Sequence, residues 1–373
     1  MKNLGTCLIC GDEKTTISSL IGVCLSCIRE RPERAIELTD KIHAETRAAF
    51  SLPPKPPTSW KGILCGMCGN NCKIDEGEKG FCGLVCNIDG HLVRMGGTPE
   101  KGVLEWYYDP LPTNCVAWWF CPGCTGAGYP KYAYKPGVEK GYANLAVFYG
   151  SCSLDCLFCQ NWHYRILSQN ASPIVSASEL SSKVNTSVSC ICFFGGDPSV
   201  QMPHALKMSE LAIADAEREK RILRVCWETN GNMRLEYAKK AAEISLQSGG
   251  IMKFDLKAWD ENLHRALCGV SNETILRNFR TIGEKYFRAR SEIPVLTAST
   301  LLVPGYIDAE EVEKLASFIA GIDRGIPYTL LAFYPQYRMS DLPTTSRSQA
   351  EECYEVAKKH LQRVRIGNVH LIS

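Results

Sequence analysis

The chain has 373 residues, 45% of them hydrophobic, which is enough for one large domain, one or two small ones and a sizeable core. Forty-two basic against 40 acidic residues leave a formal charge of +2, so we expect no nucleic-acid partner and no anionic membrane surface as a partner. Residues 1–7 form no apolar leader, and no stretch approaches the roughly 20 apolar residues that span a bilayer. These features predict a cytoplasmic protein.

Cysteine is unusually common, with 20 residues. Close pairs of the form C-x2-C recur in a long chain, which favours metal thiolates over a disulfide scaffold. All of these pairs lie before residue 160. The five later cysteines lie in apolar strand-like or helical context and are interpreted as small buried hydrophobes; they are Cys190, Cys192, Cys226, Cys268 and Cys353.

Residues 1–50 predict a zinc-ribbon module followed by a charged helix over 32–50. Two C-x2-C pairs supply four thiolates at the spacing of a closed structural zinc site: Cys7, Cys10, Cys24 and Cys27. Residues 51–59 are rich in proline, which favours extended conformation, and we interpret them as a stiff linker.

Residues 60–142 form a Cys- and aromatic-rich region with few periodic segments, so bound metal is expected to supply part of its order. A first set of thiols, for zinc or an auxiliary iron-sulfur cluster, comprises Cys65, Cys68, Cys72 and Cys82. A possible further site comprises Cys86, Cys115, Cys121 and Cys124. The aromatic residues between them are either the core of a small domain or a flat surface for a corrin or a peptide.

From residue 143 to 373 apolar, β-branched runs alternate with amphipathic segments. The runs are 143–149, 189–194, 222–227, 250–255, 295–303 and 328–333, and the helical segments between and after them are 203–220, 234–247, 273–288, 308–320 and 346–362. This alternation predicts an α/β fold in which a parallel sheet curls into a partial (β/α)6 barrel. Such barrels carry their chemistry at the carboxyl ends of the strands.

The first strand of this barrel is followed by three thiols spaced C-x3-C-x2-C, at Cys152, Cys156 and Cys159. Three thiolates can ligate three irons of a 4Fe-4S cubane and leave the fourth iron open. An incomplete ligand set is typical of catalytic sites, because it leaves room for a substrate. The alternatives are a zinc site or an electron-transfer cluster that a distant cysteine completes.

With this motif the sequence resembles the radical S-adenosylmethionine (SAM) superfamily over roughly residues 143–340. Further family elements follow the later strands: Gly-Gly-Asp-Pro from Gly195, Glu-Thr-Asn-Gly from Glu228, Asp-Leu-Lys from Asp255, Val-Pro-Gly-Tyr from Val303 and Phe-Tyr-Pro from Phe333. The resemblance implies that the cluster binds SAM and delivers the electron that cleaves it to a 5'-deoxyadenosyl radical. The SAM-binding residues it implies are Phe158, Gly195, Gly196, Asp197, Glu228, Asn230, Asp255, Lys257, Val303 and Tyr334. It does not identify the catalytic residues that act on the substrate.

The runs around Cys65 and Cys82, and Trp162 after the cluster motif, resemble a largely archaeal branch near the pyruvate formate-lyase activating enzymes. Within it, the resemblance extends to the cobalamin-dependent C-methyltransferases that act on a glutamine of methyl-coenzyme M reductase. This implies a protein or peptide substrate such as that enzyme's alpha subunit, an electron donor, and cobalamin near residues 60–142. The alternatives are a glycyl-radical activating enzyme and a non-catalytic iron-sulfur and zinc adaptor.

Overall fold

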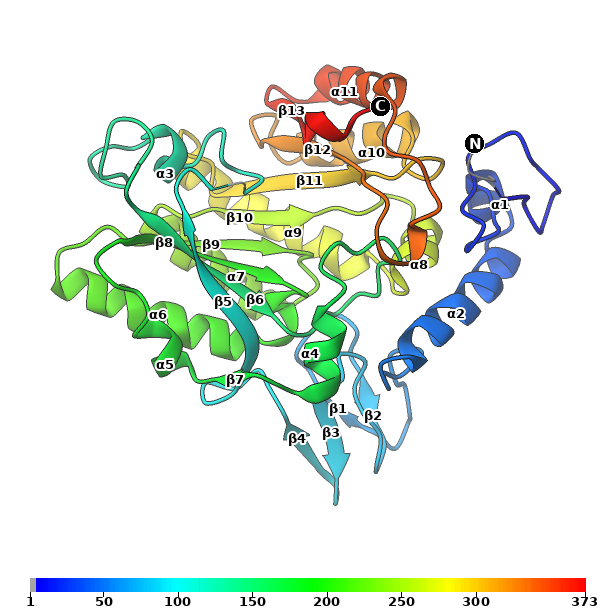
Figure 1. Ribbon diagram of the computed structural model, residues 1–373, viewed down its shortest axis with the longest axis horizontal. Coiled ribbons are helices and arrows are strands. Elements are labelled where there is room, and N and C mark those ends of the chain that lie inside the picture. The colour runs from blue at the N-terminus through cyan, green and yellow to red at the C-terminus, as the bar shows by residue number, and fades with distance from the viewer. Residues whose placement is uncertain (1–4, 114) are drawn as a thin grey trace.

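The computed structural model describes residues 5–113 and 115–373, and a nine-stranded sheet dominates these residues (Figure 1). The strand order is β13-β12-β11-β10-β9-β8-β6-β5-β7. The strands are β5 Gly102–Pro110, β6 Ala143–Tyr149, β7 Ile174–Val175, β8 Val188–Gly195, β9 Arg224–Thr229, β10 Met252–Asp255, β11 Leu296–Leu302, β12 Tyr328–Ala332 and β13 Val364–Gly367. From β6 through β13 the neighbouring strands are parallel, while β5 runs antiparallel to β6 and β7. The predicted α/β fold with a mostly parallel sheet is confirmed.

The predicted strand runs correspond to β6 and β8–β12, with ends that agree within about two residues. β13 was not predicted from the sequence, because its four residues, Val-Arg-Ile-Gly, form a strand too short and too polar to give a periodic signal. β5 was not predicted as part of the main sheet either. This strand lies within the predicted region 60–142, yet it pairs with β6 over most of its length, from Leu104 to Pro110.

Helices cover the sheet and connect its parallel strands (Figure 1). They are α4 Tyr164–Asn170, α5 Ala177–Ser181, α6 Met202–Arg218, α7 Leu235–Ser248, α8 Glu261–Cys268, α9 Glu273–Tyr286, α10 Ala309–Ala320 and α11 Arg347–His360. Short 3-10 turns lie at Pro198–Val200, Phe287–Arg290, Tyr337–Met339 and Val369–Leu371. N-terminal caps define where three of these helices begin. The side chains of Asp260, Asp308 and Ser346 each accept a hydrogen bond from the backbone amide three residues later, at the first turns of α8, α10 and α11. Of these helices, α6, α7, α9, α10 and α11 were predicted, whereas the shorter α4, α5 and α8 were not.

The N-terminal segment forms α1 Leu25–Glu30 and α2 Pro32–Ala48, and both helices pack against α8 (Figure 1). Arg29 on α1 forms ion pairs with Asp308 and Glu311 at the start of α10, at 3.0 Å to each. Tyr306 is buried between this segment and the sheet, where its hydroxyl accepts from the Ser18 amide and donates to the Val23 carbonyl. The N-terminal segment is therefore docked on the barrel.

Residues 60–142 contain two small antiparallel pairs besides β5. The pairs are β1 Ile63–Leu64 with β2 Lys73–Ile74, and β3 Val85–Ile88 with β4 His91–Arg94; the short helix α3 spans Pro122–Thr125. Glu139, at the end of this region, forms a buried ion pair with Arg224 of β9 at 2.7 Å. The region is thus tied to the main sheet at both β5 and Glu139. No helix in the described part of the chain is long and apolar enough to cross a membrane.

Candidate active site

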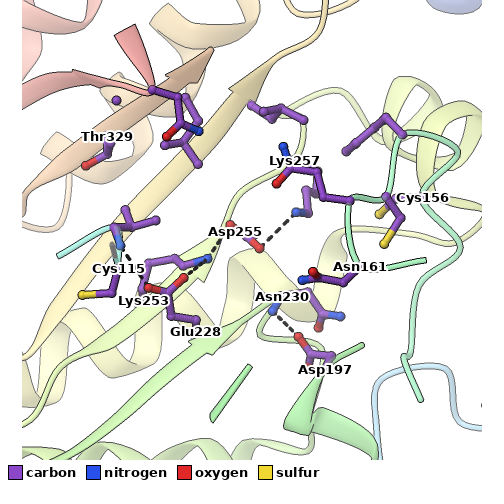
Figure 2. A pocket seen from close by; sticks show the side chains of 18 of the residues that line it. Cys115, Cys156, Asn161, Asp197, Glu228, Asn230, Lys253, Asp255, Lys257 and Thr329 are labelled. Carbon is purple, nitrogen blue, oxygen red and sulfur yellow. Dashed lines mark hydrogen bonds and ion pairs between the residues drawn. The ribbon is translucent and has the colours of Figure 1, made fainter. Parts of the chain in front are cut away.

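A cavity of about 490 Å³ opens at the carboxyl ends of the parallel strands, between the loop after β6 and the segment after β13. This volume is typical of small-molecule sites. Side chains from β9, β10 and the loops after β6 and β8 point into it (Figure 2). The predicted residues that line it are Cys152, Cys156, Phe158, Cys159, Gly195, Gly196, Asp197, Glu228, Asn230, Asp255 and Lys257. The tertiary fold therefore brings together residues that are more than 100 positions apart.

The three thiols of the C-x3-C-x2-C loop lie on one wall of the cavity. The Asn230 amide donates to the Cys152 sulfur at 3.4 Å, and the Leu154 backbone amide does so at the same distance. Cys156 contacts the sulfur of Cys268 on α8, also at 3.4 Å. Cys268 is fully buried and was interpreted from sequence as a packing residue, so this contact was not foreseen. Three thiols on one loop beside an open volume are a donor set that suits an iron-sulfur cluster.

Asp155, a residue of this loop, anchors the loop to α2 and α4. Its carboxylate is fully buried, lies 2.8 Å from His43 Nδ1 and 2.6 Å from the Arg165 guanidinium, and has Arg47 at 3.5 Å. Burial by itself raises the pKa of this carboxyl, but the hydrogen bond from His43 and the two arginines outweigh it, so the pKa lies well below its usual range. The loop is therefore anchored by an ionised carboxylate.

The Gly-Gly-Asp element after β8 packs closely under the cluster loop. A side chain at Gly196 would lie 2.2 Å from the Ser151 carbonyl oxygen, which leaves room only for glycine. Asp197 accepts hydrogen bonds from the amides of Ser199 at 2.7 Å and Asn230 at 2.6 Å. Burial raises the pKa of the Asp197 carboxyl. This residue thus joins the ends of β8 and β9 and fixes the position of Asn230.

Four charged side chains form a row across the floor of the cavity (Figure 2). Lys253 pairs with Glu228 at 3.2 Å and with Asp255 at 2.7 Å, and Asp255 pairs with Lys257 at 3.0 Å. Burial alone lowers the pKa of both lysines, but the neighbouring carboxylates raise it by more, so both amines are held protonated. Lys253 was not predicted as a site residue. It could have been found from the two-residue period of a strand, which places residues 253 and 255 on the same face of β10.

Two residues expected at SAM, Val303 and Tyr334, do not line the cavity. Val303 is fully buried next to the end of β11, and Tyr334 is 46% exposed. On β12 the residues that line the cavity are Thr329 and Leu331, whereas Tyr334 lies beyond the end of this strand at Ala332. The loop after Val303 instead meets the N-terminal segment, where Gly305 lies against the Thr16 carbonyl.

The far wall of the cavity comes from segments that were not predicted there. β13 and the turn after it supply residues 365–370, and the loop before α3 supplies Trp118 and Trp119. The Arg365 guanidinium lies 4.3 Å from the centre of the Trp118 ring. Part of the aromatic content of residues 60–142 therefore faces the barrel mouth, while Tyr107, Tyr108 and Tyr129 are exposed elsewhere.

The four thiols predicted as the first zinc site come together. The sulfur atoms of Cys7, Cys10, Cys24 and Cys27 all lie within 4.8 Å of one another, and Cys10 and Cys24 are 3.8 Å apart. Thiolates around one tetrahedral zinc ion stand about 3.8 Å apart, given zinc-sulfur bonds of about 2.3 Å. These residues could therefore hold zinc.

The second set, Cys65, Cys68, Cys72 and Cys82, lines a separate small cavity. Arg94 donates to the Cys65 sulfur at 3.4 Å and to its carbonyl oxygen at 3.0 Å. Among the described residues, only the thiols of the first set all lie within 4.8 Å of one another, so the second set is not gathered around a single point in the same way.

The four cysteines of the possible further site, Cys86, Cys115, Cys121 and Cys124, do not come together in the fold. Cys86 lies on β3, whereas Cys124 lies on α3 at the opposite end of the molecule (Figure 1). Cys115 and Cys121 line a small cavity inside the barrel together with three cysteines of the sheet. All 20 cysteines lie among the described residues, and none of them forms a disulfide in the structure.

Comparison with known families agrees with this geometry. Residues 146–319 match the radical SAM superfamily, and they include the cluster loop and most of the parallel strands. Residues 146–319 therefore form a radical SAM domain, and such a domain implies a 4Fe-4S cluster and SAM as cofactors.

Among similar proteins, an uncharacterized protein of Methanocaldococcus jannaschii is 24% identical over 82% of this chain and 81% of its own length. A putative glycyl-radical enzyme activating enzyme of the same organism is 32% identical over 30% of this chain. The isethionate sulfite-lyase activating enzyme of Oleidesulfovibrio alaskensis is 30% identical over 39%. The chain spans 41% of the length of each of these two activating enzymes. A domain of pyruvate-formate lyase-activating enzyme from Bacteroides vulgatus overlaps 48% of this chain and 98% of its own, with a TM-score of 0.36 and 22% identity.

Proposed function

We propose that this enzyme cleaves SAM reductively in the cavity at the strand ends, and that the resulting 5'-deoxyadenosyl radical abstracts a hydrogen atom from a protein or peptide. In this proposal Cys152, Cys156 and Cys159 hold the 4Fe-4S cluster. The observation that carries it is that these three thiols share one cavity with buried acidic, amide and ammonium groups. The bound cluster would supply an open iron and the electron for the cleavage.

Other side chains at the cavity have the chemistry needed to bind the carboxylate, the ribose and the adenine of SAM. The Lys257 ammonium carries the charge needed for the SAM carboxylate, and the Glu228 carboxylate can accept hydrogen bonds from the ribose hydroxyls. Phe158, on the cluster loop between Cys156 and Cys159, offers an aromatic ring for the adenine. Asn230, which donates to the Cys152 sulfur, can orient both the cluster and the methionine end of SAM.

The test is SAM cleavage by the anaerobically purified, reduced enzyme. Wild type should release 5'-deoxyadenosine, and Cys156→Ala should release none because the cluster loses a ligand. Cys353→Ala is the matched control, since Cys353 is a buried cysteine on α11 that is absent from the lining of the cavity. Cleavage by Cys156→Ala at the wild-type rate would overturn the proposal, and so would its absence from reduced wild type.

For the substrate we propose cobalamin-dependent methyl transfer to a glutamine of a protein, with the alpha subunit of methyl-coenzyme M reductase as the candidate. Support comes from the resemblance in sequence and from the aromatic faces of Trp118 and Trp119 at the cavity, which suit a flat apolar ring. Bound cobalamin would supply the methyl group to the carbon from which hydrogen was removed.

The competing proposal is activation of a glycyl-radical enzyme, which needs no cobalamin. It is supported by the two similar activating enzymes, each about 30% identical to part of this chain. In both proposals the substrate is a protein, but they differ in the residue that loses hydrogen, in the need for cobalamin and in the fate of the carbon radical.

Two measurements separate these proposals. Methyl transfer predicts about one cobalt per chain and transfer of labelled methyl from SAM to a glutamine peptide. Glycyl-radical activation predicts no cobalt requirement and an electron paramagnetic resonance doublet on the partner protein. Cobalamin-free enzyme that still generates the doublet would overturn the methyltransferase proposal.

A further inference from the structure

A cation on the wall of the cavity at the strand ends has no anionic partner among the described residues. Arg365 of β13 is half-buried and lines this cavity, yet no carboxylate forms an ion pair with its guanidinium. By contrast, the buried guanidinium groups of Arg47, Arg165 and Arg224 each face a carboxylate. A guanidinium keeps its charge at any physiological pH, so that of Arg365 is available to an anion from outside the chain.

The contact with Trp118 positions this guanidinium without using its hydrogen-bond donors. The Arg365 guanidinium lies over the indole ring, 4.3 Å from the ring centre, where a cation is attracted to the aromatic face. Its N–H groups make no hydrogen bond within the part of the chain that the structure describes. A planar fork of free N–H donors matches the two oxygens of a carboxylate or a phosphate.

Beside Arg365 the fold leaves a buried hydroxyl without a partner. Thr329 of β12 is paired in register with Arg365, and both side chains line the cavity, where Figure 2 shows Thr329 at the wall. Thr329 is 2% exposed, and its Oγ1 has no hydrogen-bond partner among residues 5–113 and 115–373. Buried hydroxyls are nearly always hydrogen-bonded, because an unpaired one costs about 1–3 kcal/mol. A ligand group bound in the cavity would supply the missing partner.

These two residues lie outside the charged row proposed to bind SAM. Lys253 and Asp255 belong to β10, and the strands β11 and β12 stand between β10 and β13. With neighbouring strands about 4.8 Å apart, Arg365 is about 14 Å from this row, measured along the sheet. The two ammonium and two carboxylate groups of the row balance one another, whereas the charge of Arg365 is not balanced. This wall therefore suits an anionic group other than the SAM carboxylate.

The ordinary alternative is a solvated arginine that only packs on Trp118. That alternative explains the stacking, but not the unpartnered hydroxyl of Thr329 beside it. The turn after β13 adds two more polar side chains to the same wall, Asn368 and His370. A guanidinium, a hydroxyl, an amide and an imidazole gathered at one cavity wall are typical of a ligand subsite.

We propose that Arg365 and Thr329 bind the carboxylate of an aspartate or glutamate in the substrate peptide. Arg365 donates two parallel hydrogen bonds to this carboxylate, and the Thr329 hydroxyl donates a third. The subsite positions the peptide, so that a residue close to the acidic one in its sequence reaches the cluster loop. This proposal rests on the protein or peptide substrate proposed above, and it adds that an acidic residue lies near the modified one.

Peptide binding to the anaerobic, cluster-loaded enzyme, with SAM present and no reductant, tests the subsite. Saturation-transfer NMR measures the Kd of acetylated, amidated Ala-Glu-Ala and Ala-Asp-Ala and of the matched peptides with Gln or Asn at the centre. We expect an acidic peptide to bind about tenfold more tightly or better than its amide counterpart, because a hydrogen bond to a charged group contributes about 1.5–3 kcal/mol. Equal affinities, or no binding of any peptide, would overturn the proposal. So would binding of inorganic phosphate alone, measured by phosphorus NMR line broadening.

Substitutions then assign the preference to these two side chains. Arg365→Gln should abolish the preference for acidic peptides, whereas Arg365→Lys should keep part of it, because it retains the charge and loses the fork. Thr329→Val preserves the shape of the side chain and should weaken acidic-peptide binding about three- to tenfold. Arg347→Gln is the control, since Arg347 is an exposed arginine on α11, and it should match wild type. An unchanged preference in Arg365→Gln would contradict the proposal.

SAM binding separates this subsite from the SAM site. Equilibrium dialysis should give the same Kd for SAM in Arg365→Gln and wild type, and a tenfold weaker Kd in the variant would place Arg365 at SAM and overturn the proposal. The peptide measurement needs no reduced cluster. Failure of reduced wild type to release 5'-deoxyadenosine would therefore overturn the reaction proposed above, whereas normal release without a preference for acidic peptides would overturn the subsite alone.

Discussion

At the scale of single residues, the row of alternating charges on the cavity floor is the feature that the strands build most directly. Lys253 and Asp255 lie on one face of β10, and Glu228 lies on the neighbouring strand β9. Lys253 lies between two carboxylates and Asp255 between two ammonium groups, at 2.7 to 3.2 Å, so removal of either charge leaves a partly buried end member of the row without its partner in the row.

Lys257 is the member of this row best placed to bind an anion, because it has one carboxylate partner where Lys253 has two. We expect Lys257→Met to weaken SAM binding by about 10- to 100-fold, because a hydrogen bond to a charged group contributes about 1.5–3 kcal/mol. Equilibrium dialysis against the anaerobic, cluster-loaded enzyme measures the Kd. Lys240→Met, an exposed lysine on α7, is the control. An unchanged Kd for Lys257→Met would remove this residue from the proposed SAM site.

At the scale of elements, the loop after β11 has a different role from the one expected. The Val-Pro-Gly-Tyr element was expected at SAM, but it receives the N-terminal segment instead. Gly305 has φ +79°, and a side chain there would lie 1.9 Å from the Thr16 carbonyl oxygen. Tyr306 supplies the hydrogen bonds that complete the contact. Docking of the predicted zinc module therefore depends on a barrel loop.

Gly305→Ala should loosen this docking without unfolding the sheet. The left-handed conformation costs a residue with a Cβ about 1–2 kcal/mol, and the clash with Thr16 adds to it. Hydrogen exchange should therefore become about tenfold faster or more in residues 5–30, whereas the strands of the sheet keep their protection. The control is Gly137→Ala, since nothing lies within 4 Å of a side chain at that position. Equal exchange in both variants would show that the contact is not needed.

At the scale of the whole molecule, Asp155 connects the cluster loop and the adjacent helix α4 with α2, where His43 is 112 residues away in the sequence. It lies on the cluster loop, His43 and Arg47 lie on α2, and Arg165 lies on α4. All four side chains are buried. The position of the predicted cluster is therefore coupled to the N-terminal helices as well as to the barrel.

Asp155→Asn should destabilise the protein by about 3–5 kcal/mol, because two buried guanidinium groups lose their counter-charge. Thermal melting of the anaerobic protein measures the change. The control is Glu261→Gln, which breaks an exposed pair with Arg265 on α8 and should cost only about 0.3–0.5 kcal/mol. Melting temperatures that fall equally in the two variants would contradict this role for Asp155.

The sequence by itself determined what depends on local patterns. Strand-helix alternation after residue 143 predicts the parallel sheet, because the two-residue and 3.6-residue periods are properties of short segments. The C-x3-C-x2-C spacing likewise predicts a three-thiolate loop, since its ligands are neighbours in the chain.

Only the tertiary structure decided which distant side chains meet. The contact of Cys156 with Cys268, the wall formed by β13, and the convergence of Cys115 with Cys190 and Cys226 each join segments more than 70 residues apart. No local period encodes such contacts, because they depend on the order of strands in the sheet and on how the sheet curls. The thiols of the barrel interior therefore resemble ordinary apolar strand residues until the fold assembles them.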